Sequence, residues 1–407
     1  MRNYLKINFI CFSLMLFFSI SGSAQNQTQI LGQKSENSIA DTIKWSERMA
    51  LSIMKRHPKA WQIDNNEKPK WEYKPSFMLF SIQKLYNQTK KSKYNNYIKE
   101  YADTFIDSSG FLSHYEMKDY NLDFINPGKL LFELNSTSKD SRYLKVMQLL
   151  KKQIEGQPRT ESGVFWHKKI YPNQMWLDGL YMESPFYTRY TVTFEEGKGL
   201  NDIANQFELI HAHSFEKKLG LPYHAWDESK LIGWANKETG TSPTIWSRAV
   251  GWYAMALVDV LDYYPKEHPK YKELVSYLNE VAIAIAKQQD KSGLWFQVTD
   301  AGTKEGNFLE TSSSSMFAYA FAKGVNKGYL PKKYKKIADK TFTGIVKDFV
   351  KVDQNGEVHL EQISFSAGLG GTPFRDGSYK QYTDGKKLVD NSVGVGAFIL
   401  AAIELDK

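Results

Sequence analysis

Apolar residues recur every three or four positions along most of this chain. That spacing places them on one face of a helix. Twelve segments show the pattern: 41–56, 74–88, 93–107, 127–135, 141–154, 179–190, 195–219, 243–264, 271–289, 311–327, 332–350 and 392–405. Alternating runs typical of half-buried strands are few and short, and no linker rich in Pro, Ser or Gly interrupts the series. We therefore predict an all-α chain in which residues 25–407 form a single domain.

Short motifs that join a glycine to apolar or aromatic residues separate the predicted helices. Gly110, Gly163, Gly220, Gly293 and Gly356 mark five of them, 53 to 73 residues apart. Each interval is long enough for two helices, and a helix pair buries its apolar face only against neighbouring pairs. Six such pairs predict a closed (α/α)6 barrel whose inner helices start at a loop-lined mouth. An open helical solenoid is the alternative.

The first 24 residues have the pattern of a secretory signal peptide. Arg2 and Lys6 precede an apolar run over 7–20, and small residues lead up to Ala24. We predict cleavage after Ala24 and export to the periplasm or the medium. Cys11, the single cysteine, lies within that run, so we expect no disulfide and no cysteine-based metal site in the mature chain. No later segment contains a run of apolar residues long enough to span a membrane.

Composition narrows the classes of ligand. Aromatic residues make up 14% of the chain, including ten Trp and 24 Tyr. Aromatic rings mostly fill cores, but they also stack on the flat C–H faces of sugars, so this excess in an exported protein favours carbohydrate binding. The formal net charge of +8 arises from scattered lysines and favours anionic ligands. No nucleic-acid-binding module is present, so nucleic acid is not an expected partner.

Two acidic residues stand where predicted helices begin. Asp178 follows Trp176 and Leu177, and Asp123 precedes the helix over 127–135. Aspartate is a favoured N-cap, so a capping role is one interpretation of both residues. The other is catalytic: apolar neighbours would raise the pKa of Asp178 so that it holds a proton near neutral pH. Two carboxylates at one mouth are typical of glycosidases.

Other residues are candidates either for binding a sugar substrate or for a structural role. His224 is a candidate base or hydrogen-bond donor, or a structural histidine. Arg248 and Trp252 are four residues apart on one helix face, where they can hold a carboxylate and stack a sugar, or form a salt bridge over a core tryptophan. His211 and His213 point to different helix faces, which argues against a paired metal site.

One glycine-rich stretch, 368–372, has the look of a phosphate loop. It lacks the GK[ST] ending and the strand–loop–helix setting of such loops. We instead expect this stretch to turn the backbone tightly near a pocket.

Taken together, several blocks of sequence resemble the unsaturated rhamnogalacturonyl hydrolases, glycoside hydrolase family 105. The resemblance spans most of the chain, and the family implies an (α/α)6 barrel. The blocks include LDFINPGKLL, GVFWHKKIYPNQMWLDGLYM, GLPYHAWDES, ETGTSPTIWSRAVGWYA, SGLWFQVTD, NFLETSSSSMFAYAFAKGVNKGYL, SAGLGGTPFRDGSY and DNSVGVGAFILAA.

The resemblance also implies roles for individual residues. The family's catalytic acid/base corresponds to Asp178 and its partner acid to Asp123. Its substrate-pocket positions correspond to Tyr73, His167, Lys168, Trp176, Met182, His224, Arg248 and Trp252. At Tyr73 the following residues depart from the family's glycine-containing pattern. The family requires no metal or organic cofactor.

The implied reaction is hydration of the C4=C5 double bond of an unsaturated uronic acid at the non-reducing end of an oligosaccharide. Such substrates are left by polysaccharide lyases, as uronyl-rhamnose units from pectin or, in sulfated form, from ulvan. The alternatives are a sugar epimerase on the same barrel, which uses paired histidines, and a surface glycan-binding protein without catalysis. The sequence sets no oligomeric state.

Overall fold

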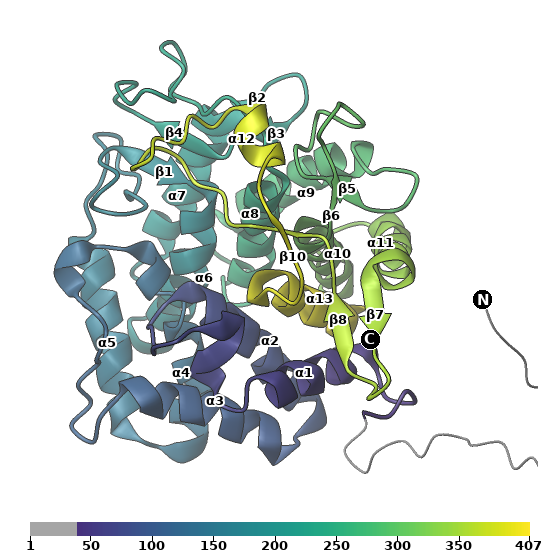
Figure 1. Cartoon of the computed structure of the whole chain (residues 1–407). Coiled ribbons are helices and arrows are strands. Elements are labelled where there is room, and N and C mark those ends of the chain that lie inside the picture. The colour runs from purple at the N-terminus through teal and green to yellow at the C-terminus, as the bar shows by residue number, and fades with distance from the viewer. Residues whose placement is uncertain (1–38) are drawn as a thin grey trace, which may run out of the picture.

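The computed structural model describes residues 39–407. The predicted signal peptide, residues 1–24, lies outside the described residues and stays a prediction. Within 39–407 there are twelve helices of eleven residues or more, arranged as an inner and an outer ring (Figure 1). All twelve predicted helices are present.

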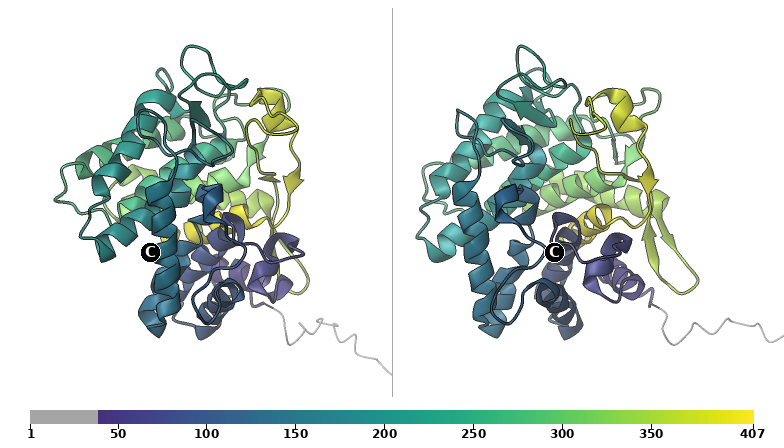
Figure 2. Two further views of the ribbon diagram at one scale, coloured as in Figure 1. Left: turned by 90° about the vertical axis from the view of Figure 1, so that its left-hand side faces the viewer. Right: turned by 60° about the vertical axis from the view of Figure 1, so that its left-hand side comes forward.

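The inner ring is closed. Each inner helix contacts the next, and α13 near the end of the chain packs between α2 and α10, which completes the circle (Figure 2). The fold is thus an (α/α)6 barrel, and the open solenoid is wrong. In ring order the inner helices are α2 (Tyr73–Thr89), α4 (Gly128–Ser138), α6 (Leu177–Phe194), α8 (Ser247–Val260), α10 (Thr311–Asn326) and α13 (Ser392–Leu405).

The outer helices each pack against an inner neighbour. They are α1 (Trp45–Arg56), α3 (Ser92–Phe105), α5 (Ser141–Gly156), α7 (Leu200–Ser214), α9 (Tyr271–Lys287) and α11 (Lys333–Phe349). Burial is most complete in the inner helix α8 and least complete in the outer helix α11: every residue of α8 is buried, whereas five of the 17 residues of α11 are. A helix that is apolar all round belongs inside, and one with a single apolar stripe belongs at the surface.

Aromatic rings fill the barrel axis. Phe77 of α2 meets Trp252 of α8 at a ring-centroid distance of 4.9 Å, and Tyr181 of α6 stacks on Trp252 at 4.8 Å. Because α2 and α8 lie on opposite sides of the ring, these contacts close its centre. The barrel is therefore a bowl with a solid aromatic floor.

The five glycine motifs have a common backbone reason. Gly110, Gly163, Gly220, Gly293 and Gly356 all have positive φ, between 70° and 104°, which favours glycine. In three of these loops an aspartate oxygen accepts the N–H of the residue two positions on, at 2.8–2.9 Å. The motifs are tight turns that follow outer helices.

Short strands and 3-10 turns edge the barrel. Ten strands of two or three residues within 39–407 form five antiparallel pairs. The pairs are β1 (Gln174–Trp176) with β4 (Ala225–Asp227), β2 (Phe215–Glu216) with β3 (Leu221–Pro222), β5 (Trp295–Phe296) with β6 (Leu309–Glu310), β7 (Val350–Val352) with β8 (Val358–Leu360), and β9 (Ile363–Ser364) with β10 (Lys387–Leu388). The 3-10 turns are η1 (Ala60–Asn65), η2 (Met117–Asp119) and η3 (Leu122–Phe124).

Two helices were predicted to be longer than they are, and one short helix was not predicted. The segment 195–219 contains the shorter α7, because Gly197 has positive φ before it and Phe215 begins β2 after it. The segment 243–264 contains the shorter α8, whose N-cap Trp246 is extended. The short helix α12 (Tyr379–Thr383) was not predicted. Among residues 39–407, no helix combines the length and apolarity needed to cross a membrane.

Gly344 tests whether the glycine turns and the helices pack as one unit. A Cβ at this position of α11 would lie 2.3 Å from the carbonyl oxygen of Ser292, in the turn around Gly293. We expect Gly344→Ala to lower the free energy of unfolding by about 1–3 kcal/mol, despite the better helix propensity of alanine. Urea unfolding measures it, with the exposed Lys347→Ala on the same helix as control. Equal or greater stability of Gly344→Ala would contradict this packing.

Candidate active site

The inner helices all begin at one rim of the barrel, because each hairpin of two helices returns the chain to the same side. Tyr73 is the first residue of α2, Asp178 the second of α6 and Arg248 the second of α8. Asp123 lies in η3, just before α4. The predicted residues of the site therefore converge on this rim from separate hairpins.

Asp178 does not cap its helix. The N-cap of α6 is Trp176, and no side chain accepts a hydrogen bond there. Instead Oδ2 of Asp178 lies 3.2 Å from Nε2 of His224, and the carboxylate side chain is 15% exposed. Neither of these two atoms has another partner among the described residues. The carboxylate thus faces an imidazole at the edge of the mouth.

A tyrosine from the far end of the chain fixes the other side of that imidazole. Nδ1 of His224 lies 2.6 Å from the hydroxyl of Tyr382, in α12. Burial raises the pKa of Tyr382 well above its ordinary value, so this phenol keeps its proton. When the phenol donates to Nδ1, the ring hydrogen of a neutral imidazole is on Nε2 and points at Asp178. Tyr382, His224 and Asp178 thus form one line.

The predicted direction of the pKa shift at Asp178 is wrong. Burial does act to raise the pKa of Asp178, but the contacts with the nearby imidazoles, above all that of His224, outweigh it and lower that pKa. The apolar neighbours in sequence are real, yet an imidazole 46 positions away decides the sign. Asp178 is accordingly ionised at neutral pH when no substrate is bound.

Asp123 also has no capping role. Its own N–H donates to Oδ1 of Asn121, which is the cap of η3. Its carboxylate accepts a hydrogen bond from Nζ of Lys168 at 2.6 Å and lies 3.7 Å from Nε2 of His167. Burial opposes the charge of Lys168, but the contact with Asp123 raises the pKa of Lys168 above its ordinary value. The two side chains form an ion pair beside the mouth.

His167, by contrast, is held neutral. Burial lowers the pKa of His167 to about 4, although Asp123 opposes this shift. The ring stacks on Trp176 at 4.9 Å. A Cβ on Gly179 would lie 3.1 Å from Nδ1 of His167, so this glycine allows the ring its close approach to α6.

Trp176 and Met182 are buried at the rim. Two rings, those of His167 and Tyr171, stack on Trp176, which is 5% exposed. Met182 is also buried, and its sulfur accepts from Nδ2 of Asn126 at 3.5 Å. Neither side chain offers an exposed platform for a sugar ring.

Arg248 and Trp252 do not act as the predicted pair. The guanidinium lies over the ring of Trp246, 5.4 Å from its centroid, while Trp252 is buried on the barrel axis. The alternative interpretation, a core tryptophan, is correct for Trp252. Arg248 does form a salt bridge, but it is buried: Nη2 of Arg248 lies 3.5 Å from the carboxylate of Glu310. The prediction that Arg248 and Trp252 share a helix face was correct, but the ring beside the guanidinium is that of Trp246, which is closer to Arg248 in sequence.

Glu310 was not singled out from the sequence. It is fully buried and caps α10 by accepting the N–H groups of Ser312 and Ser313. Burial acts to raise the pKa of Glu310, but Arg248 and these backbone donors lower it overall. Its place before the serine run of α10 was a capping signal, but its partner Arg248, on the neighbouring inner helix α8, could not be identified from the sequence.

Tyr73, at the start of α2, keeps its phenolic proton. Burial raises the pKa of Tyr73, and the negative charges of Asp123 and Asp178 add to this shift. Its ring meets Trp252 edge-on at 6.3 Å.

The described residues offer no cluster of three or more His, Asp or Glu side chains that converge as metal ligands. The charged groups of the mouth are instead engaged with one another. These pairings are Asp178 with His224, Asp123 with Lys168, and Arg248 with Glu310.

Comparison with known proteins gives the family. The family model for Glycosyl Hydrolase Family 88 matches residues 45–407. A family 105 glycoside hydrolase of C. acetobutylicum ATCC 824 is 41% identical in sequence, with a TM-score of 0.86 over 89% of this chain and 99% of that one. The unsaturated rhamnogalacturonyl hydrolase YesR of Bacillus subtilis is 24% identical over 65% of this chain and 73% of YesR.

A more distant structure shares the fold alone. The unsaturated glucuronyl hydrolase of Bacillus sp. GL1 is 11% identical, with a TM-score of 0.67 over 89% of this chain and 95% of that one. The family match and the 41% identity together extend over nearly all described residues. This chain therefore belongs to the glycoside hydrolases that the family 88 model describes, and within them to family 105.

Proposed function

We propose that this enzyme hydrates the C4=C5 double bond of an unsaturated uronic acid at the non-reducing end of an oligosaccharide and so releases the next sugar. The observation that carries the proposal is the carboxyl of Asp178 at the mouth, 15% exposed and aligned by His224. Asp123 differs from it, because Lys168 neutralises its charge. One acid is thus free for proton transfer while the other is bound.

The proposed reaction needs one proton donor. The carboxyl of Asp178 gives its proton to C4, and the electron pair of the double bond forms the new C–H bond. The cation left at C5 is shared with the ring oxygen. Water adds to C5 and returns a proton to Asp178. The resulting hemiketal opens to a ketone, and the hemiacetal at C1 then expels the next sugar.

The lowered pKa of free Asp178 requires that substrate binding change its protonation. A uronate carboxylate entering the mouth adds negative charge and excludes water. Both effects raise the pKa of a neighbouring carboxyl. The substrate itself therefore promotes the acid form of Asp178, which limits proton donation to the occupied site.

Lys168 is the better partner for the uronate carboxylate. Its side chain is 22% exposed, whereas that of Arg248 is 2% exposed. Arg248 is then a fixed positive charge behind the site. Tyr73 and Asp123 are placed to hydrogen-bond the sugar hydroxyls or the attacking water.

The proposed substrates are uronyl-rhamnose oligosaccharides left by polysaccharide lyases, from pectic rhamnogalacturonan or from ulvan. The likeness to YesR supports a rhamnogalacturonan product. Export by the signal peptide, to the periplasm or the medium, is part of the same proposal. Family membership favours hydrolysis over the epimerase and the glycan-binding alternatives.

Replacement of the proton donor tests the proposal. We expect Asp178→Asn to lower kcat roughly 100- to 10,000-fold, because the amide cannot deliver a proton to C4. The measurement is the loss of the double-bond absorbance of a lyase-generated disaccharide. Asp119→Asn, an exposed acid near Asp123, serves as control and should keep full activity. Undiminished turnover by Asp178→Asn would remove the donor assigned here.

The pH profile tests the role of His224. Since His224 lowers the pKa of Asp178, removing the ring leaves burial to raise that pKa. The acid form then persists to higher pH, so the alkaline limb of kcat/KM should move upward in His224→Ala, at a lower maximal rate. His211→Ala on α7 provides the control. A fall in rate with an unmoved limb would show that His224 has only a structural part.

A further inference from the structure

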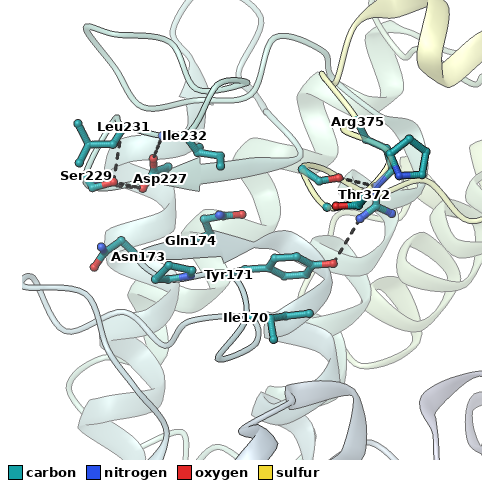
Figure 3. A pocket seen from close by; sticks show the side chains of 14 residues that line it. Ile170, Tyr171, Asn173, Gln174, Asp227, Ser229, Leu231, Ile232, Thr372 and Arg375 are labelled. Atoms are coloured by element: carbon teal, nitrogen blue, oxygen red, sulfur yellow. Dashed lines mark hydrogen bonds between the residues drawn. The ribbon is translucent and has the colours of Figure 1, made fainter.

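An open cavity of about 830 Å³ lies at the same rim, outside the acid cluster. Three segments wall it: residues 170–174 before β1, residues 227–232 after β4, and residues 370–375 of the C-terminal segment (Figure 3). Its volume is within the range of sites that bind small ligands. Neither Asp178 nor Asp123 lines it.

One aromatic residue separates this cavity from the catalytic pair. The ring of Tyr171, which lines the cavity, stacks on Trp176 at 4.9 Å. Trp176 in turn meets the ring of His224 edge-on at 5.2 Å. The cavity also borders β1, directly after which α6 and Asp178 begin. The cavity therefore lies next to the catalytic pair, with Trp176 between them.

The cavity wall carries an uncompensated positive charge. The guanidinium of Arg375 donates to the carbonyl oxygens of Gly370 and Leu369, at 2.9 and 3.2 Å, and to the hydroxyl of Tyr171 at 3.3 Å. All three acceptors are neutral. Among the described residues no carboxylate forms an ion pair with Arg375. Its charge is thus available to a ligand.

The negative residue of the lining is already satisfied. Oδ1 of Asp227 accepts from the N–H and the hydroxyl of Ser229, and Oδ2 accepts from the N–H of Ile232. Asp227 is 1% exposed. It holds its own loop together and forms no ion pair with Arg375.

The glycine-rich stretch 368–372 packs closely around the guanidinium of Arg375. A Cβ on Gly368 would lie 2.2 Å from Nη1 of Arg375, and one on Gly371 would lie 3.1 Å from Nη2. Gly370 and Arg375 exchange two backbone hydrogen bonds, at 2.8 and 3.2 Å. The backbone wraps closely around the guanidinium and fixes its direction. This accounts for a motif that the catalytic residues leave unexplained.

The rim of the cavity carries exposed aliphatic side chains. Ile170 is 72% exposed and Leu231 is 81% exposed, and both line the opening (Figure 3). Large apolar groups gathered at the edge of a cavity typically mark a binding surface. Here they are suited to the C–H faces of sugar rings.

We infer that this cavity binds the sugars that follow the scissile bond and that Arg375 binds an oxyanion, a sulfate or a carboxylate, carried by those sugars. A guanidinium in a fixed direction presents parallel N–H donors that match such groups. Arg375 thereby selects anionic oligosaccharides. The inference rests on the proposed function, because it takes the terminal sugar to lie at Asp178.

The test compares three substrates that share the unsaturated terminal sugar. They are a disaccharide with neutral rhamnose, the same disaccharide with rhamnose 3-sulfate, and a longer pectic product with a uronate beyond the rhamnose. We expect Arg375→Gln to lower kcat/KM roughly tenfold or more on an anionic substrate, and little on the neutral one. Glutamine keeps N–H donors for the carbonyl oxygens of Gly370 and Leu369 without the charge.

The outcomes separate the sources of the oxyanion. Loss on the sulfated substrate assigns a sulfate site, loss on the longer product assigns a carboxylate site, and loss on both supports a general oxyanion site. Lys380→Ala removes an exposed charge from the nearby α12 and should change none of the three. Equal effects of Arg375→Gln on all three substrates, or no effect, overturn the inference.

A binding measurement keeps this test distinct from that of the proposed function. Calorimetric titration of Asp178→Asn with the three substrates gives three dissociation constants. In the double variant with Arg375→Gln, the ratio of the neutral constant to that of an anionic substrate should fall toward one. Absence of turnover in the wild type would defeat the proposed function alone. Ratios unchanged by Arg375→Gln for both anionic substrates would defeat the oxyanion site alone.

Discussion

A helix that is apolar on every side is stable in water only when other elements surround it, and a closed ring covered by a second ring provides such surroundings. The inner helix α8 depends on this arrangement, because every one of its residues is buried. Closure by α13 between α2 and α10 then has a consequence for function. The beginnings of all six inner helices meet at one rim, above a floor of stacked aromatic rings. The residues of the site are neighbours because the ring is closed.

Charge at that rim is stabilised by pairing. Burial disfavours an isolated ion, so each buried group is held by an opposite charge or by several hydrogen bonds. Lys168 stabilises Asp123, and Glu310 stabilises Arg248, which leaves Asp178, aligned by His224 and Tyr382, as the group that can change protonation. The arriving uronate supplies the negative charge that shifts this balance. The outer cavity continues the same surface toward the following sugars.

The twelve long helices were predictable because each is encoded locally, in the 3.6-residue period and in turns that require glycine. Closure of the ring was inferred from the number of helix pairs, because the contact of α13 with α2 joins opposite ends of the chain. The two aspartates were predictable as a pair at the mouth, but not their partners. Tyr382 is 158 residues away from His224, and Glu310 is 62 residues away from Arg248. The lowered pKa of Asp178 follows from such a distant contact, so sequence neighbours gave the wrong sign.

The most direct measurement of the central claim follows the reaction in D2O by proton NMR. The vinyl H4 resonance of the unsaturated uronic acid and the signals of the released sugar are recorded together at early times. The account predicts that the vinyl signal disappears no later than the next sugar is released, and that the product carries one deuteron added at C4. Release of that sugar while the double bond persists would contradict it, because the bond would then have broken without proton transfer to C4.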